Sequence, residues 1–235
     1  PEILLEDCLR IAPDFHLARN TYANALSEAQ KYSQALVEID YLEKAEPQNF
    51  SHSILAASIE VMVGNYEAAV KRYEILTQQF PRHAQLHNSH GHALKTIGRQ
   101  ADAIAAYRRA ISVKETLGET YWNLANLKTF RFDPVDVDRM RALIAKDETT
   151  PKDYYHLCFA LGKALEDRGE FDDSFGYYVL GNERKQQQEG YQADDTTNDI
   201  NALISHCTQS LFETRPTTGN QAADPIFIVG LVSKR

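Results

Sequence analysis

The sequence predicts an all-α protein built as a solenoid of helical hairpins. Three observations predict this fold: prolines, small residues and glycines each recur at a fixed interval of 34 residues. A fixed period of this length is typical of repeat proteins in which each unit is one pair of helices. The recurring sets are Pro13, Pro47 and Pro81; Ala35, Ala69 and Ala103; Gly64 and Gly98; Tyr32 and Tyr66; and Tyr73 and Tyr107.

The second repeat shows how these residues build a hairpin. Gly64 ends the first helix, because glycine adopts a left-handed conformation at little cost. Ala69 is small enough to let the two helices approach closely, and Tyr73 fills the gap to the next repeat. Pro81 stops the second helix, because proline has no backbone N–H to donate. The same order of residues predicts the same hairpin in the neighbouring repeats.

The register sets the repeat boundaries. It predicts three full repeats, at 16–49, 50–83 and 84–117. Residues 1–15 match the second helix of an earlier repeat, with Pro13 in register, so we expect the sequence to start within a repeat.

The period degrades after the third repeat, and we expect residues 118–188 to form degenerate hairpins of the same kind. Residues 118–129 suit a first helix, and Pro134 suits the first turn of a short amphipathic helix. The pattern returns in residues 153–185, where a further hairpin is expected. Its matching residues are Gly162, Gly169, Phe171, Ser174 and Tyr178.

The end of the chain differs in character. Residues 189–224 are expected to form one more helix, roughly 195–212, and a linker rich in Pro, Gly and Thr. In residues 225–235 the run from Ile226 to Leu231 is β-branched and aromatic, which suits a buried strand. The sequence therefore predicts a short extended segment at the C-terminus.

From its first residue to about Leu127 the sequence resembles the tetratricopeptide repeat (TPR) family, which implies a right-handed superhelix. The order of the later segments is similar to that of the bacterial TPR-sulfotransferases. It comprises TPR hairpins, the segment Phe132–Ala145, a further hairpin, a linker and "PIFIVGL". On this resemblance the chain is the N-terminal TPR region, and residues 225–235 begin the sulfotransferase domain.

The sulfotransferase resemblance implies a parent protein that moves a sulfuryl group from 3′-phosphoadenosine-5′-phosphosulfate (PAPS) to a hydroxyl. In that family a loop after the strand holds the phosphosulfate, because free backbone N–H groups suit a phosphate. Residues 232–235, Val-Ser-Lys-Arg, do not match that loop. We therefore assign no catalytic and no PAPS-binding residue, and we expect the chain itself to be non-catalytic and to hold no cofactor.

A concave face lined by the first helix of each hairpin is where TPR arrays bind peptides. Amide side chains can hold an extended backbone, and a lysine can hold a carboxylate. Trp122 suits either an anchor for a peptide or packing against the next hairpin. A solvated polar face would explain the same pattern. The predicted groove residues are Asn20, Asn24, Asn88, His92, Lys95, Trp122 and Asn126.

Four histidines in residues 83–92 form a candidate metal site. His83, His87 and His90 are spaced so that three imidazoles could share one edge of a helix, and His92 lies close by. However, His87 and His90 occupy positions that usually pack within the repeat, and no Cys or carboxylate lies near them in the sequence. We predict packed histidines and no bound metal, and keep a metal-dependent regulator as a third hypothesis.

Composition and charge limit the classes of partner and the compartment that we expect for this chain. The net charge of −8 argues against a nucleic acid, which needs a basic face, and no apolar run approaches the ~20 residues that span a bilayer. Cys8, Cys158 and Cys207 are few and far apart, which favours a reducing compartment and hence the cytoplasm. We expect a protein or peptide partner, and copies of the C-terminal strand could also pair with each other.

These observations lead to one main hypothesis and one alternative. The main hypothesis is a scaffold for protein–protein interaction and substrate presentation, the non-catalytic part of a PAPS-dependent sulfotransferase. The alternative is a free-standing TPR adaptor that binds peptides in its concave groove.

Overall fold

The computed structural model describes residues 2–190 and 192–213 of the chain. Within these residues every regular element is an α-helix, as the sequence predicts. The chain divides into two compact units, Pro1–Gln188 and Glu189–Arg235. The extended segment predicted at 225–235 lies outside the described residues.

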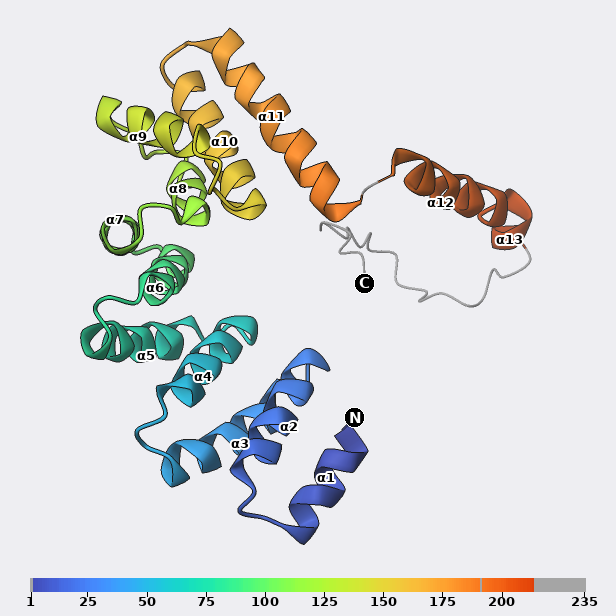
Figure 1. Ribbon diagram of the computed structural model, residues 1–235. Helices are drawn as coiled ribbons and strands as arrows, with labels where there is room; N and C mark the ends of the chain where they lie inside the picture. Colours follow the sequence, from blue (N-terminus) through green and yellow to red (C-terminus); the bar gives the residue numbers. More distant parts are fainter. Residues whose placement is uncertain (1, 191, 214–235) are drawn as a thin grey trace. The chain divides into compact units, whose positions relative to one another are not determined.

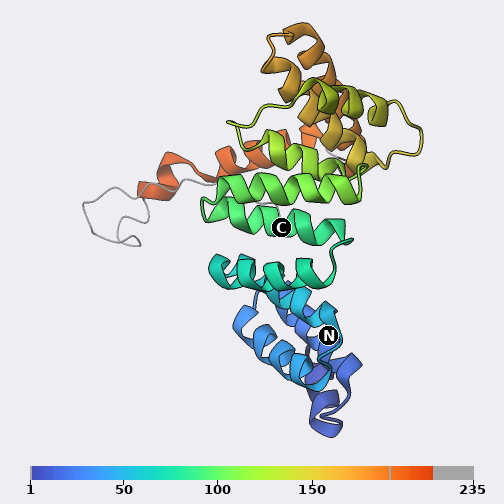
Figure 2. The ribbon, with the colours of Figure 1, turned by 90° about the vertical axis from the view of Figure 1, so that its left-hand side faces the viewer.

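The first unit begins as a series of helical hairpins. The first helices of the hairpins, α2, α4 and α6, lie along one side of the stack, and α3, α5 and α7 lie along the other (Figure 1). Figure 2 shows the same succession of stacked helices from a second direction. The helices are α1 (Glu2–Ile11), α2 (His16–Glu28), α3 (Tyr32–Ala45), α4 (Phe50–Met62), α5 (Tyr66–Gln79), α6 (Ala84–Thr96) and α7 (Gln100–Val113).

A left-handed residue ends the first helix of each hairpin. Gly64 and Gly98 have φ values of 79° and 80°, as the sequence predicts for this position. The first hairpin has Gln30 there instead, with φ of 61°. A side chain is disfavoured in this conformation, so the first turn carries a strain that the other two avoid.

Small residues let the helices of a hairpin approach closely. Gly91 lies against the ring of Tyr107, and a Cβ added at Gly91 would fall 2.6 Å from a ring carbon. The recurring alanines Ala35, Ala69 and Ala103 are all fully buried. These contacts fix the spacing of each pair of helices.

The region after the third hairpin contains α8 (Gly118–Ala125) and α9 (Pro134–Ile144). The first of these is shorter than the predicted 118–129, because the chain turns after it, with Lys128 at φ of 61°. The second begins at Pro134, as predicted, and the Asp133 side chain accepts a 2.9 Å hydrogen bond from the Asp136 backbone N–H.

A further hairpin, α10 (Pro151–Glu166) and α11 (Phe171–Glu189), restores the pattern of the repeat. Gly162 faces the ring of Tyr178, and its carbonyl accepts a 2.7 Å hydrogen bond from Ser174. Gly169 follows the first helix with φ of 77°. These residues therefore hold the places that the repeat pattern predicts for them.

Two close contacts join this hairpin and α9 to the preceding helices. The Gly118 N–H donates a 2.9 Å hydrogen bond to Asp153, and a Cβ at Gly118 would collide with the Asp153 backbone. Arg108 of α7 makes two 2.6 Å hydrogen bonds to the buried carboxylate of Asp136 in α9. Such a two-point contact fixes orientation as well as distance.

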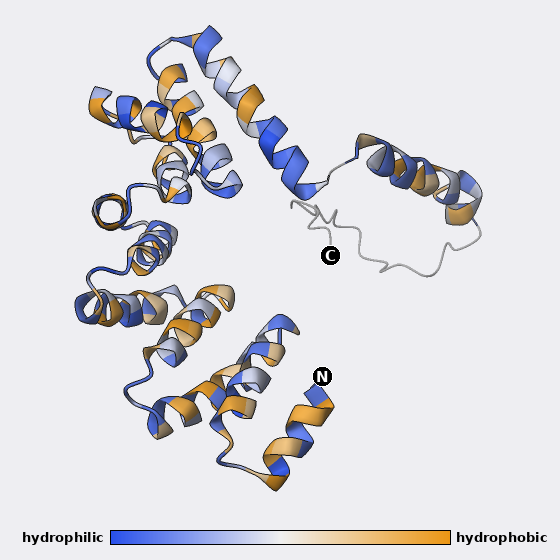
Figure 3. Ribbon diagram, in the orientation of Figure 1, coloured by the Kyte–Doolittle hydropathy of each residue, from blue (hydrophilic) through white to orange (hydrophobic). Residues whose placement is uncertain are grey.

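The hydrophobic core of the first unit consists of two clusters that meet at α4. One holds the apolar residues of the first hairpin together with Ala56 and Ile59. The other runs from Ala57 onward to α10. In Figure 3 hydrophobic residues recur along these helices, whereas the C-terminal half of α11 is hydrophilic.

The second unit contains α12 (Ala193–His206) and α13 (Gln209–Glu213). The single helix predicted at roughly 195–212 is wrong, because the chain leaves helical geometry at Cys207, with φ of −83° and ψ of 55°. Ile200, Leu203 and Ile204 on α12 are exposed. None of the helices in the described ranges is long and apolar enough to cross a bilayer.

Candidate functional site

A hollow of about 200 Å³ lies on the first-helix side of the second and third hairpins. Three helices, α4, α6 and α8, supply most of its walls, and the ring of Tyr73 reaches it from α5. Its lining residues are Ser58, Val61, Met62, Tyr73, Gln85, Asn88, Ser89, His92, Glu119 and Asn123. This is the face on which the sequence predicts a groove, so we call it the groove hollow.

Asn88 organises the polar side of the groove hollow. It is only 2% exposed, and its Oδ1 accepts hydrogen bonds from Thr120 Oγ1 at 3.0 Å and Asn123 Nδ2 at 3.1 Å. Both donors come from α8, so the carbonyl end of the amide is held by the neighbouring helix. The NH₂ end makes no hydrogen bond to another described residue and is a donor for a ligand.

Apolar side chains form the other side of the groove hollow. Met62 is 67% exposed, Val61 is half-buried, and Tyr73 is 4% exposed. Burial raises the pKa of the Tyr73 hydroxyl, which therefore stays protonated at neutral pH. A flexible methionine beside an aromatic ring suits an apolar side chain of a ligand.

The charge at the groove hollow is modest. Partial desolvation, and then the nearby Lys95 ammonium, lower the pKa of His92, so its imidazole is neutral at pH 7. Glu119 supplies a carboxylate, which accepts a 3.3 Å hydrogen bond from Lys152. Neutral donors and acceptors therefore dominate, as they do where a peptide backbone is bound.

The structure brings two of the predicted groove residues, Asn88 and His92, into the groove hollow. Asn20 and Asn24 lie on the first hairpin, where the Asn24 side chain donates to the Asn20 carbonyl at 2.8 Å. Lys95 is half-buried, and Asn126 is exposed at the end of α8. These last four residues do not line the groove hollow.

Trp122 packs against the following hairpin. Its ring centroid lies 5.5 Å from that of Phe159 in α10, and its half-buried side chain borders the larger hydrophobic cluster. Of the two roles that the sequence allows for this tryptophan, the structure shows the packing role.

Sequence reasoning missed most of the groove hollow, namely Ser58, Val61, Met62, Tyr73, Gln85, Ser89, Glu119 and Asn123. Most of these residues are not amides, and the search for amides passed over them. The 34-residue register held the missing signal for Ser58, since it occupies the place in α4 that Asn24 and His92 occupy in α2 and α6.

The four clustered histidines have separate environments. His83 Nδ1 accepts a hydrogen bond from the Leu86 N–H, and His87 Nε2 donates to the Pro81 carbonyl at 3.0 Å. His90 is half-buried, and its burial lowers its pKa. No group of three metal-binding side chains occurs among the residues that the structure describes.

Two solved structures share the order and packing of these helices. MamA is 17% identical, with a TM-score of 0.54, over 72% of this chain and 97% of its own. YrrB, described as a TPR protein with an unusual peptide-binding site, is 14% identical, with a TM-score of 0.53, over 77% of this chain and 91% of its own. The chain has a TPR-like helical repeat fold.

Other comparisons agree with the TPR-like fold. BtubC from P. vanneervenii is 16% identical, with a TM-score of 0.57, over 80% of this chain and 89% of its own. Residues 15–119 match the family model of the bacterial transcriptional activator domain. At these identities the likeness to the solved structures concerns the fold alone. No curated protein sequence matches the chain.

Proposed function

We propose that this chain is a scaffold that binds an extended peptide in the groove hollow. The observation that carries the proposal is the held side chain of Asn88, whose NH₂ is left as a donor beside the exposed Met62. An extended peptide offers both a carbonyl acceptor and an apolar side chain. The TPR-like fold and the peptide-binding site named for YrrB support the same assignment.

The peptide would be held by its backbone and by one apolar side chain. Asn88 would donate to a peptide carbonyl, and the neutral imidazole of His92 could donate or accept beside it. Met62 and Val61 would cover the apolar side chain. Glu119 would favour a peptide N–H or a basic side chain over a carboxylate at its end of the groove hollow.

Selection of peptides from a random displayed library tests this proposal. Selected peptides are then titrated against the unaltered chain, Met62→Gln and Val37→Gln. Both positions are exposed apolar sites, 67% in each case, but only Met62 lines the groove hollow. We expect Met62→Gln to weaken binding at least about fivefold, because the peptide loses an apolar contact, and Val37→Gln to leave it unchanged.

Either of two results would overturn the proposal. One is a library that yields no saturable binder. The other is a set of binders whose affinity for Met62→Gln equals that for Val37→Gln, since such peptides would lie elsewhere.

This proposal is the adaptor alternative of the sequence analysis rather than its main hypothesis. The family and structure comparisons give no support to the sulfotransferase resemblance. The predicted strand in residues 225–235, with which that resemblance ends, lies outside the described residues. A PAPS-dependent parent protein and pairing of C-terminal strands therefore stay predictions. The cytoplasmic location, which was inferred from the cysteines, also stays a prediction.

A further inference from the structure

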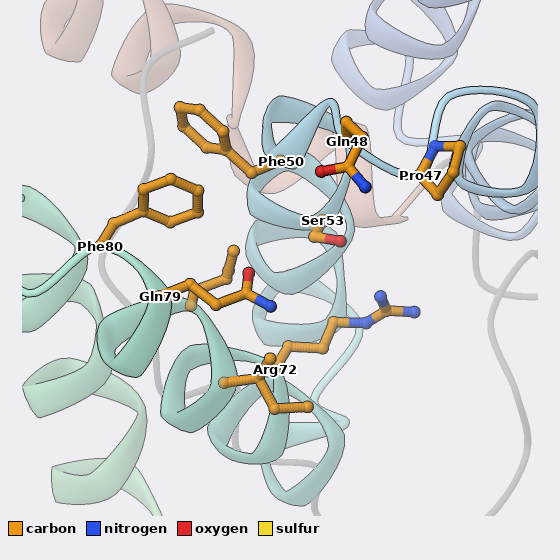
Figure 4. A pocket seen from close by; sticks show the side chains of 9 residues that line it. Pro47, Gln48, Phe50, Ser53, Arg72, Gln79 and Phe80 are labelled. Carbon is orange, nitrogen blue, oxygen red and sulfur yellow. The ribbon is translucent and has the colours of Figure 1, made fainter.

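A second hollow, of about 440 Å³, lies where the first and second hairpins meet, and we call it the seam pocket. It is bounded by the loop between α3 and α4, the first turn of α4, and α5 (Figure 4). It shares no residue with the groove hollow. Its volume falls within the roughly 300–1,000 Å³ of small-ligand sites. Its lining residues are Pro47, Gln48, Phe50, Ser53, Arg72, Ile75, Leu76, Gln79 and Phe80.

One wall of the seam pocket is apolar. The rings of Phe50 and Phe80 lie with centroids 4.1 Å apart, and Figure 4 shows them side by side. Ile75 continues this wall and is 57% exposed. In the first hairpin the places of the two phenylalanines are taken by His16 and Glu46, which form a 2.8 Å hydrogen bond instead. The aromatic wall therefore distinguishes the second hairpin from the first.

The opposite wall is polar and is built around Arg72. Its Nε donates to Glu60 Oε1 and its Nη1 to Glu43 Oε1, each at 2.8 Å. Ser53 also donates to Glu43. The second terminal nitrogen, Nη2, makes no hydrogen bond to a described residue, so it offers two N–H groups to a ligand. In Figure 4 the guanidinium lies across the pocket from the rings.

Glu60, which holds the guanidinium, breaks the pattern of the repeat. It is 8% exposed and stands where the neighbouring hairpins have the buried leucines Leu26 and Leu94. A carboxylate at a core position costs stability relative to an apolar residue unless it is well paired. Sequences break such local rules mainly at functional sites. Glu60 holds the guanidinium of Arg72 at this wall of the seam pocket.

We propose that the seam pocket binds a second peptide segment, one with an aromatic or large aliphatic side chain flanked by Lys or Arg. The apolar side chain would pack on Ile75 and Phe80, and a backbone carbonyl would accept from Arg72 Nη2. Arg72, the charged residue of this lining, is paired with the two carboxylates of Glu43 and Glu60, so the three side chains together have a net negative charge at this wall. That charge favours basic flanking residues and disfavours a carboxylate.

The test uses capped pentapeptides as probes and the whole chain as the receptor. Backbone amide shifts are followed in NMR titrations with Ala-Lys-Phe-Lys-Ala, Ala-Glu-Phe-Glu-Ala and Ala-Lys-Ala-Lys-Ala at millimolar concentration. We expect the first to shift the amides around Phe50 and Ile75, and the other two to bind at least about fivefold more weakly.

Three matched variants then separate this site from the groove hollow. Ile75→Gln, Met62→Gln and Val37→Gln each replace an exposed apolar side chain on a helix with the same residue. Because all three sites are exposed, each variant should have the same melting temperature as the unaltered chain. We expect at least about fivefold weaker binding of Ala-Lys-Phe-Lys-Ala to Ile75→Gln alone.

Several results would overturn the inference. One is the absence of any saturable shift with Ala-Lys-Phe-Lys-Ala. Another is an affinity for Ala-Glu-Phe-Glu-Ala that equals the affinity for Ala-Lys-Phe-Lys-Ala. A loss of binding in Met62→Gln with none in Ile75→Gln would place the probe in the groove hollow. That last result would support the groove proposal while refuting this one, so the two proposals fail separately.

Discussion

Arg72 Nε lies 2.8 Å from Glu60 Oε1, and the two side chains join α5 to α4 at a position where other hairpins bury a leucine. The Glu60 side chain is 10% exposed and that of Arg72 is 33% exposed. Solvent therefore screens the pair mainly on the arginine side. The energetic role of this pair can be measured apart from its proposed role in binding.

Arg72→Met should destabilise the chain, because it leaves the Glu60 carboxylate buried without its partner. We expect the free energy of unfolding to fall by about 1–3 kcal/mol. This is less than for a fully buried ion pair, because Arg72 is partly solvated. Urea unfolding measures it. The double variant Glu60→Leu with Arg72→Met should recover most of that loss. A double variant as unstable as Arg72→Met alone would refute this account.

Gly91→Ala tests the close approach of α6 and α7. The added methyl group would lie 2.6 Å from the Tyr107 ring, so the ring or the two helices must shift. Overpacking of this kind costs about 1–3 kcal/mol. Adding Tyr107→Ile should restore stability, since the first hairpin has Ala23 and Ile39 at the corresponding positions. Thermal unfolding of the single and the double variant measures both effects. If Tyr107→Ile restored no stability to Gly91→Ala, contact with the Tyr107 ring would not be the cause of the loss.

Gln30→Gly should stabilise the first hairpin. Gln30 has φ of 61°, and glycine relieves that strain at the cost of more freedom in the unfolded chain. The net gain should be about 0.5–1 kcal/mol. The comparison is Lys71→Gly, at an exposed position inside α5, where glycine should lose about 1 kcal/mol. Denaturant midpoints that fell for both variants would contradict the prediction.

Glu46 should make stability depend on pH in the acid range. Hydrogen bonds from His52, then Asn49 and His16, lower the pKa of its carboxyl to about 2. A carboxyl with a depressed folded pKa stabilises the fold above its unfolded pKa, and that contribution is lost as the pH falls from about 4.5 toward 2. Glu46→Gln should therefore flatten the pH dependence of the urea midpoint within this window. Parallel curves for the two proteins would show that Glu46 contributes nothing there.

The repeats could be predicted from sequence because their signals are local. Gly64, Gly98 and Pro134 act through their own backbone conformations, so the residue type alone indicates where a helix ends or begins. No such signal in the sequence marks the early end of α8. There the left-handed residue is Lys128, and residue type does not favour that conformation for a lysine.

The two hollows were harder to predict, because each combines side chains from several helices. Asn88 was predicted as a groove residue, but its partners Thr120 and Asn123 come from α8 and became apparent only in the fold. The seam pocket did leave one signal in the sequence. Glu60 stands 34 residues from both Leu26 and Leu94, and a charge in a recurring apolar position marks a departure from the core.

The most direct test of the groove proposal is to map a selected peptide onto the chain by backbone amide shifts in NMR. The account predicts that the shifts at saturation concentrate on α4, α6 and α8, around Met62, Asn88 and Asn123. It also predicts that Met62→Gln weakens these shifts at equal, sub-saturating peptide concentration. Shifts confined to other helices, with the amides around Asn88 unmoved, would contradict the central claim.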